Sequence, residues 1–142
     1  QKFAPKMPVY VEAERKKIGR ISLPAGLFDA MHASPCLRIE VAMDIRVNGL
    51  LEDYQHYVDN PEKFIEHLQP LHRFHGAKQL DHWSEMIRAG ELTTMVGELL
   101  TLHYDPSYSR AITGHYAQLD NAKPVELDDL SEDALKKIAA TL

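Results

Sequence analysis

The stretch that most constrains the fold is residues 8–24, where a β-branched and aromatic run passes directly into a cluster of charge. Val9-Tyr10-Val11 has the composition of a buried strand. Charged residues follow it at once, and Pro24 is placed to begin a helix at its first position, where a missing N–H costs nothing. A strand that delivers charged groups to its carboxyl end before a helix is how open α/β sheets form ligand sites. A strand followed by a solvated loop is the simpler alternative, and the pattern alone leaves both open.

The composition is that of an ordinary soluble globular domain. The chain has 142 residues, of which 44% are hydrophobic and 26% charged, enough for one domain with a real core. No apolar run approaches the roughly 20 residues of a membrane span. A single cysteine, Cys36, excludes an internal disulfide and fits a reducing compartment, so we expect a cytoplasmic protein with no membrane partner. Because the chain begins with Gln1 and runs straight toward a predicted strand, we expect it to be part of a longer protein.

The net charge of −5 argues against a dedicated nucleic-acid module. Its distribution is uneven, however. Residues 1–20 hold six Lys or Arg against two Glu, whereas residues 120–142 hold six acids against three Lys. The basic N-terminal part can meet phosphate groups, although a solvated charged face is the alternative.

Two strands and a helix are predicted at the beginning of the chain, and one strand and one helix at its end. The periodicity predicts a helix over 24–33 and a strand over 36–41, which with the run at Val9 forms a parallel βαβ unit. Residues 123–127 predict a third, short strand. Ser131 is expected to cap a final helix with a buried face at Leu135, Ile138, Ala139 and Leu142.

The middle of the chain predicts a compact array of helices joined by short turns. Asp44 is expected to cap the first, Asn60-Pro61 to start the second and Pro70 to end it, with stops at Gly76 and Gly90. Asp105-Pro106 is expected to break the helical pattern, and a short helix over 108–119 is one option for the ambiguous stretch that follows. The array comprises helices over about 45–58, 61–70, 77–89 and 91–103, the last with a buried face at Leu92, Met95, Val96, Leu99 and Leu102.

This order predicts an α/β fold in which an incomplete parallel sheet of about three strands, similar to that of P-loop kinases, carries a large all-helical insertion. We expect the βαβ part of the core over residues 1–42, the insertion over 43–104, and a loop, strand and helix that complete the core over 105–142. The phosphate-binding loop itself, Gly-x-x-x-x-Gly-Lys-Ser/Thr, occurs nowhere in the sequence.

The charged turn supplies most of the candidate phosphate-binding or tRNA-binding residues. Glu12 and Glu14 are two positions apart, so in an extended chain they face the same way and can share a metal or a proton; pairing with nearby cations is the more frequent outcome. The basic residues around Gly19 can contact phosphates, or form a solvated turn. The cationic candidates are Lys16, Lys17, Arg20 and, at the start of the helix after the second strand, Arg46.

A second, looser group lies after the helical array. Tyr104, Asp105 and Tyr108 can line a pocket or stack on a base, or they can simply cap the helix; Arg110 is included with them. No metal site is expected, because the eight histidines lack ligand spacing and His72 and His75 have no cysteine beside them. No catalytic residue can be named, since Cys36 opens a predicted buried strand with no evident base.

Several segments in a consistent order resemble the bacterial tRNA 2-selenouridine synthases. The most specific are Val9-Tyr10-Val11-Glu12-Ala13-Glu14 followed by Lys17-Ile18-Gly19-Arg20-Ile21-Ser22-Leu23-Pro24, and Leu99-Leu100 with His103-Tyr104-Asp105-Pro106-Ser107-Tyr108. Ala33-Ser34-Pro35 leading into Leu37-Arg38-Ile39-Glu40, and Arg46 with Leu50-Leu51-Glu52-Asp53-Tyr54, also agree. Where the family reads Glu-Ser-Arg, this chain has Glu14-Arg15-Lys16, which removes a hydroxyl and keeps positive charge.

The resemblance implies part of a two-domain enzyme that modifies the wobble uridine of certain tRNAs. Such enzymes carry an upstream rhodanese-like domain and a P-loop domain, and convert 2-thiouridine to 2-selenouridine through an S-geranylated intermediate. Their substrates are tRNA, selenophosphate and geranyl diphosphate, and no cofactor is expected within this chain. By itself the chain would contribute to tRNA and diphosphate binding and be inactive.

Two other functions fit the residues. One is half of a P-loop nucleotide or small-molecule kinase, and the other is a helical interaction module whose polar loops dock a partner. The predicted incomplete sheet would leave an open edge, which favours self-association of the chain when it is studied alone.

Overall fold

The computed structural model describes residues 8–13, 17–18, 20–113, 115–116 and 118–141. It has a mostly helical α/β fold, as its strands are few and short. The chain divides into two compact units, here called unit 1 (residues 1–38 and 107–125) and unit 2 (residues 39–106 and 126–142).

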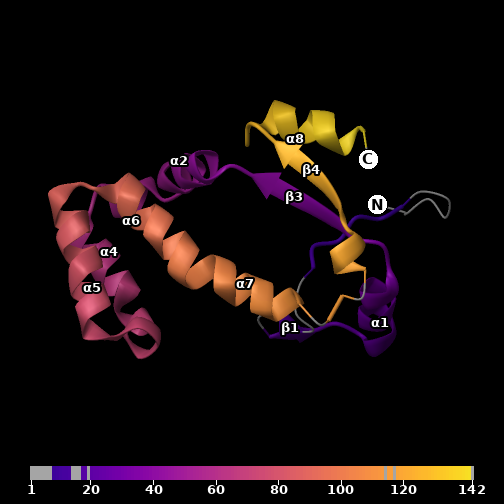
Figure 1. The fold of residues 1–142 in the computed structure, drawn as a ribbon, viewed down its shortest axis with the longest axis horizontal. Helices are drawn as coiled ribbons and strands as arrows, with labels where there is room; N and C mark the ends of the chain where they lie inside the picture. Colours follow the sequence, from indigo (N-terminus) through magenta and orange to yellow (C-terminus); the bar gives the residue numbers. More distant parts are fainter. Residues whose placement is uncertain (1–7, 14–16, 19, 114, 117, 142) are drawn as a thin grey trace. The chain divides into compact units, whose positions relative to one another are not determined.

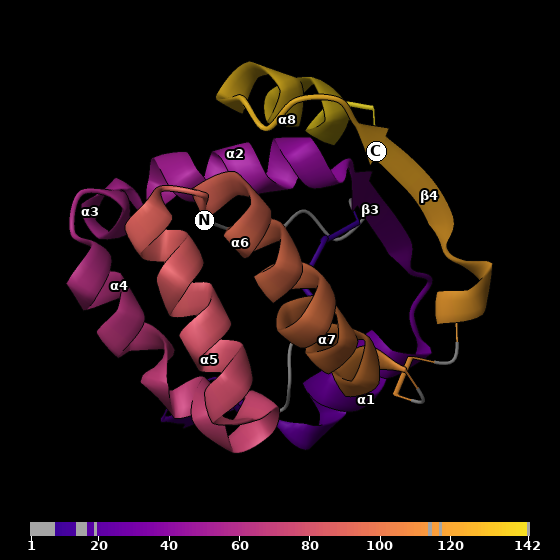
Figure 2. The same cartoon turned by 60° about the vertical axis from the view of Figure 1, so that its left-hand side comes forward.

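Unit 2 contains the predicted helical array. Figure 2 shows three of its helices, α4, α5 and α6, running side by side, and α2 packs against α6. Short connections join them, which is typical of antiparallel helical neighbours. The elements are α2 (Met43–Asp53), α3 (Gln55–Val58), α4 (Pro61–Leu68), the 3₁₀ turn η1 (Gln69–Leu71), α5 (His72–Ala89), α6 (Leu92–Leu99) and the π-helical turn η2 (Leu100–Tyr104).

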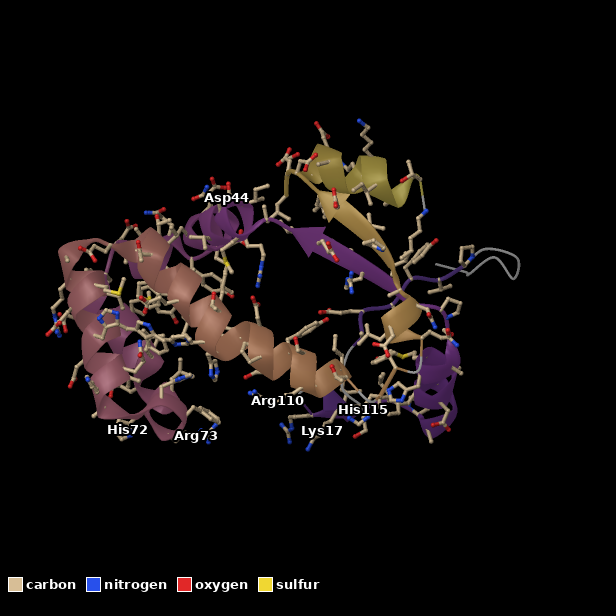
Figure 3. The ribbon with its side chains drawn as sticks, in the orientation of Figure 1. Lys17, Asp44, His72, Arg73, Arg110 and His115 are labelled. Carbon is tan, nitrogen blue, oxygen red and sulfur yellow. The ribbon has the colours of Figure 1, made fainter. Side chains whose placement is uncertain are left out.

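The start and stop signals of these helices are mostly confirmed. The Asn60 side chain accepts a hydrogen bond from the Lys63 amide at 3.2 Å and so caps α4. Gly90 ends α5 in the left-handed region at φ 78°. Gly76, at φ 76° and ψ 173°, interrupts α5, so that His72–His75 form a separate turn. The predicted cap at Asp44 is wrong, because the N-cap is Ala42. Asp44 lies in the first turn of α2 (Figure 3), where its negative charge interacts favourably with the helix dipole.

The core of unit 2 is a single cluster of buried apolar side chains from α2, α4, α5 and α6. Trp83 and Met95 are fully buried in it. The buried face predicted for the helix over 91–103 supplies Met95, Val96 and Leu99, whereas Leu102 is about half exposed. The cluster comprises Val47, Ile65, Leu68, Leu80, Trp83, Met86, Ile87, Met95, Val96, Leu99 and Leu100.

The predicted break at Asp105-Pro106 is wrong. The helix continues from α6 through the wide turn η2 into α7 (Asp105–Ile112). Proline is tolerated in the first turn of a helical segment, and a π turn absorbs the lost hydrogen bond without ending the helix. Likewise the option of a helix over 108–119 is wrong in its bounds, because α7 ends at Ile112.

Unit 1 holds a small hairpin, helix α1, most of helix α7 and a 3₁₀ turn. Strands β1 (Lys17–Ile18) and β2 (Ile21–Ser22) pair antiparallel, with Lys17 opposite Ser22. Helix α1 (Ala25–Ala33) begins after Pro24, as predicted. Most of α7 and the 3₁₀ turn η3 (Leu119–Asn121) also belong to this unit.

Strands β3 (Leu37–Val41) and β4 (Lys123–Leu127) form a two-stranded parallel sheet, which Figure 1 shows as adjacent arrows. Both strands lie where the sequence predicted them, and the boundary between the units crosses both. The predicted strand at Val9-Tyr10-Val11 is wrong, however. These side chains are more than half exposed, and the run is not part of a strand in the part of the chain that the structure describes. The predicted βαβ unit is therefore replaced by the β3–β4 pair.

The last helix, α8 (Glu132–Ala139), starts where predicted. The Ser131 side chain accepts a hydrogen bond from the Ala134 amide at 3.3 Å. Its predicted buried face is wrong for Leu135 and Ala139, which are exposed, and Leu142 lies outside the described residues. The division of the chain into a phosphate-loop core and an insertion stays a prediction. In the part of the chain that the structure describes, no helix has both the length and the apolar character to cross a membrane.

Candidate functional site

The N-terminal charged turn folds as the β1–β2 hairpin of unit 1. Lys17 lies on β1 and Arg20 in the turn between the strands, and both are exposed. Glu12 precedes the hairpin as an exposed residue without regular structure, whereas Glu14 and Lys16 lie outside the described residues. A short hairpin with exposed cations on a strand and on its turn is compatible with phosphate contact.

Arg46 and Asp105, which the sequence assigned to separate groups, form a paired site in unit 2. The two guanidinium nitrogens of Arg46 donate to the two carboxylate oxygens of Asp105, at 3.0 Å (Nη1–Oδ2) and 2.5 Å (Nη2–Oδ1). Arg46 comes from the first turns of α2 and Asp105 from the first residue of α7. This fork-to-fork geometry joins two helices that are far apart in the sequence.

The hydrogen bonds with Asp105 change what Arg46 can do. They raise the pKa of Arg46 above its ordinary value, against the opposing effect of desolvation. Both side chains remain about one third exposed. Arg46 is therefore a fixed, charge-balanced group, and a phosphate would have to compete with Asp105 for it.

Arg46 also lines an open cavity of about 900 Å³ that lies entirely within unit 2. Tyr104, from the second predicted group, lines the same cavity. Apolar side chains of α2, α4 and α6 and the loop before α8 also line it. In that loop Leu130 packs so tightly on α2 that a Cβ added at Gly49 would lie 3.0 Å from it.

The other two members of the second group belong to unit 1. Tyr108 and Arg110 are both exposed on α7, and Arg110 donates to the Ser107 hydroxyl at 3.2 Å. Figure 3 labels Arg110 together with Lys17 and His115 of the same unit.

A histidine and aromatic cluster in unit 2 went unnoticed as a site in the sequence. The ring nitrogens His75 Nε2 and His103 Nδ1 are 3.0 Å apart and share a hydrogen bond. Phe74 packs against His103 with ring centroids 5.3 Å apart, and His75 meets the edge of Trp83 at 5.2 Å. The basic residues around Phe74 in His72-Arg73-Phe74-His75 were the available signal in the sequence. Only the fold brings His103 beside this segment.

The described residues include no group of three or more His, Cys, Asp or Glu side chains that could hold a metal ion. Cys36 precedes β3 and is half-buried, and its thiol approaches the Ser34 carbonyl oxygen at 3.8 Å.

Comparison with known proteins relates this chain to one family. A family model described as "tRNA 2-selenouridine synthase AAA domain" matches residues 1–90. The curated tRNA 2-selenouridine synthase of Shewanella oneidensis is 41% identical over 58 residues, which are 41% of this chain and 15% of that protein. The matching segment is thus a small part of that relative. No solved structure matches the chain.

Proposed function

This chain belongs to the family of tRNA 2-selenouridine synthase AAA domains, and from that premise we propose that it works as part of a transferase that modifies tRNA. The observation that carries the proposal is the family match over residues 1–90, which contain the charged hairpin, β3 and Arg46. Because the substrate is tRNA, the reaction belongs in the cytoplasm.

The reaction is the replacement of sulfur by selenium at the wobble uridine. The sulfur of 2-thiouridine takes the geranyl group of geranyl diphosphate and diphosphate leaves. The selenium of selenophosphate then attacks C2 of the uracil ring and displaces the alkylated sulfur as geranylthiol, and hydrolysis of the selenium–phosphorus bond releases phosphate and leaves 2-selenouridine. Other parts of the protein, a rhodanese-like domain and a phosphate-binding loop, supply groups that this chain lacks, so the chain alone is inactive.

The proposed role of this chain is to hold phosphate-bearing substrates at the edge of a P-loop-type core. The exposed cations Lys17 and Arg20 lie on one short hairpin, which supports contact with the tRNA backbone or a diphosphate. Arg46 serves as a positioning residue held by Asp105. The β3–β4 pair has the parallel direction of a P-loop sheet and is completed by strands elsewhere in the protein.

The test is nucleoside analysis of tRNA. The gene that contains this chain is expressed in a bacterium deleted for its own tRNA 2-selenouridine synthase, and wobble nucleosides are measured by mass spectrometry. We expect 2-selenouridine to reappear. Unchanged 2-thiouridine, with the protein present and folded, would contradict the proposal.

The role of the hairpin is tested in the same strain. The double variant Lys17→Ala/Arg20→Ala should form less 2-selenouridine and bind tRNA more weakly. Because it loses two phosphate contacts, the slope of log binding constant against log salt concentration should become shallower by roughly 1 per contact, or about 2 in all. The control is Lys137→Ala, which removes an exposed lysine of α8. Equal binding and equal salt dependence in the hairpin variant and the control would rule out the phosphate role of the hairpin.

A further inference from the structure

We propose that unit 2 carries a site for unstacked RNA bases, here called the aromatic step, formed by Arg73, Phe74, His103 and Tyr104. The inference rests on the proposed function in one respect, namely that the RNA bound in the cell is the tRNA substrate. The site lies where the start of α5 meets η2, within unit 2.

The four planar groups contact one another in sequence, at tilted and edge-on angles: 50° between the Phe74 and His103 rings and 80° between the His103 and Tyr104 rings. The Arg73 guanidinium lies 4.6 Å from the centre of the Phe74 ring. The Phe74 and His103 rings are 5.3 Å apart, and the His103 and Tyr104 rings 5.1 Å apart. Phe74 is 58% exposed and Tyr104 51% exposed, so the aromatic faces are accessible. Exposed rings with an adjacent guanidinium are the means by which proteins stack on single-stranded bases.

Contacts with the core of unit 2 hold the His103 ring of the aromatic step in place. The hydrogen bond between His75 and His103 joins the turn before Gly76 to η2. His75 in turn contacts Trp83, which is fully buried and donates to Glu98 at 3.1 Å. A rigid platform loses less conformational freedom on binding than two mobile aromatic side chains would.

The charge around the aromatic step suits a polyanion. No acidic residue occurs from residue 67 to residue 80, in a chain whose net charge is −5. That stretch carries Arg73, Lys78 and three histidines, and Figure 3 shows His72 and Arg73 together at the start of α5. Among the described residues no carboxylate forms an ion pair with Arg73 or Lys78. The nearest acid in sequence to Tyr104 is Asp105, whose charge is balanced by Arg46.

These observations favour single-stranded RNA over a duplex. The bases of a duplex are stacked on one another and present only their edges, whereas a loop can offer its bases to an aromatic face. The anticodon loop, where the wobble uridine lies, is such a single-stranded region. Phe74 and Tyr104 are therefore expected to contact bases, and Arg73 and Lys78 the phosphates beside them.

The experiment measures binding of the purified 142-residue chain to two fluorescent probes. One is a short RNA stem-loop with an anticodon-like loop, and the other is an RNA duplex of the same length. We expect the stem-loop to bind more tightly. Phe74→Ala should weaken its binding on the order of tenfold, since a base stacked on an aromatic ring contributes that much, with little effect on the duplex.

Matched variants separate stacking from charge and from misfolding. Phe74→Trp should retain stem-loop binding, because it keeps an aromatic face. Tyr54→Ala removes an equally exposed aromatic residue of unit 2 outside the aromatic step and should have no effect. Arg73→Ala should weaken binding and lower the salt dependence, whereas Lys137→Ala should do neither. Phe74 is exposed, so its variants should keep the wild-type circular dichroism spectrum and melting temperature.

The outcomes distinguish this inference from the proposed function. Stem-loop binding that is unchanged by Phe74→Ala, equal binding of duplex and stem-loop, or no binding of either RNA would overturn the aromatic step. None of these results bears on the nucleoside analysis. Conversely, loss of stem-loop binding in Phe74→Ala without formation of 2-selenouridine in cells would keep the RNA site and overturn the modification chemistry.

Discussion

Arg46 has a different partner in the structure from the one that the sequence predicts. The sequence offers it as a cation for phosphates, but in the structure both its terminal nitrogens are occupied by Asp105. Arginine and carboxylate match geometrically in this bidentate form, which lysine cannot reproduce. The pair therefore holds the first turn of α2 to the beginning of α7.

A double-mutant cycle measures this pair. Arg46→Ala and Asp105→Ala should each lower the free energy of unfolding by about 1 kcal/mol or less, because the side chains are about one third exposed and solvent screens them. The double variant should be less destabilised than the sum of the two, as judged by urea unfolding. Strict additivity would mean that the pair contributes nothing.

Asp129 makes a pH-dependent contribution to the stability of the folded chain. Hydrogen bonds from the Ser131 hydroxyl at 2.6 Å and the Ser131 amide at 2.8 Å lower the pKa of Asp129 below its ordinary 3.8. The stabilisation is present above pH 3.8 and is lost as the pH falls through the folded-state pKa. Ser131→Ala should move the pKa back toward 3.8 in an NMR titration of the carboxyl carbon. Asp129→Asn, the control, should abolish this pH dependence while α8 stays capped, and an unshifted titration in Ser131→Ala would refute the assignment.

The candidate site residues stay predictions, and the contacts that the structure shows among them could not be predicted from the sequence. Residue type and local charge identified Lys17, Arg20 and Arg46 as cations near a strand or helix end. That Arg46 meets Asp105, and that Phe74 meets His103, depends on contacts between helices that no local pattern encodes. For the same reason the sequence placed Asp105 with Tyr108, whereas the two fall in different units.

At the scale of elements, several caps and stops predicted from local chemistry held, whereas the cap at Asp44, the strand at Val9-Tyr10-Val11 and the break at Asp105-Pro106 did not. Caps and stops at Asn60, Gly90 and Ser131 act within one turn of helix, so they can be read directly from neighbouring residues. The strand at Val9-Tyr10-Val11 was mispredicted because composition alone does not specify the neighbour with which a strand must pair. Asp105-Pro106 failed because a π turn carries the helix past the proline.

The two left-handed glycines should differ in their response to substitution. Gly76 has φ 76° and ψ 173°, a conformation that is essentially restricted to glycine. Gly76→Ala should therefore cost about 1–3 kcal/mol in urea unfolding. Gly90, at φ 78° and ψ 13°, is in the ordinary left-handed helical region, and Gly90→Ala should cost nearer 1 kcal/mol.

A control for this comparison lies in α1. Gly26 has helical backbone and open space around a built Cβ, so Gly26→Ala should be neutral or stabilising by up to about 1 kcal/mol. Gly76→Ala that is as stable as the wild type would show that the turn before Ala77 is not held as described.

At the scale of the whole chain, the apolar core is unevenly shared. All members of the buried cluster lie in unit 2, whereas the described part of unit 1 contributes only Tyr116 and Ala122 as buried apolar residues. Apolar side chains of β3 and α1, among them Ile39 and Leu27, are about half exposed. In the complete enzyme these surfaces are proposed to be covered by the rest of the P-loop core, and self-association of the isolated chain stays a prediction.

Hydrogen exchange should reproduce this asymmetry. Amides of α4, of α5 after Gly76 and of α6 should exchange most slowly, because the buried cluster closes over them, whereas amides of α1 and α8 should exchange fast. Mass spectrometry of the exchanging chain gives the rates by segment. Protection of α1 equal to that of α6 would contradict the picture of a single core in unit 2.

In the π-helical turn between α6 and α7, the number of residues determines whether Asp105 can reach Arg46, and the residue types matter less. Each residue of a helix advances the following side chains by about 100° around the axis. Deleting the exposed Thr101 would leave the core side chains of α6 in place and rotate Asp105 out of reach of Arg46. Natural insertions and deletions in this turn should therefore be counter-selected even where substitutions are freely accepted.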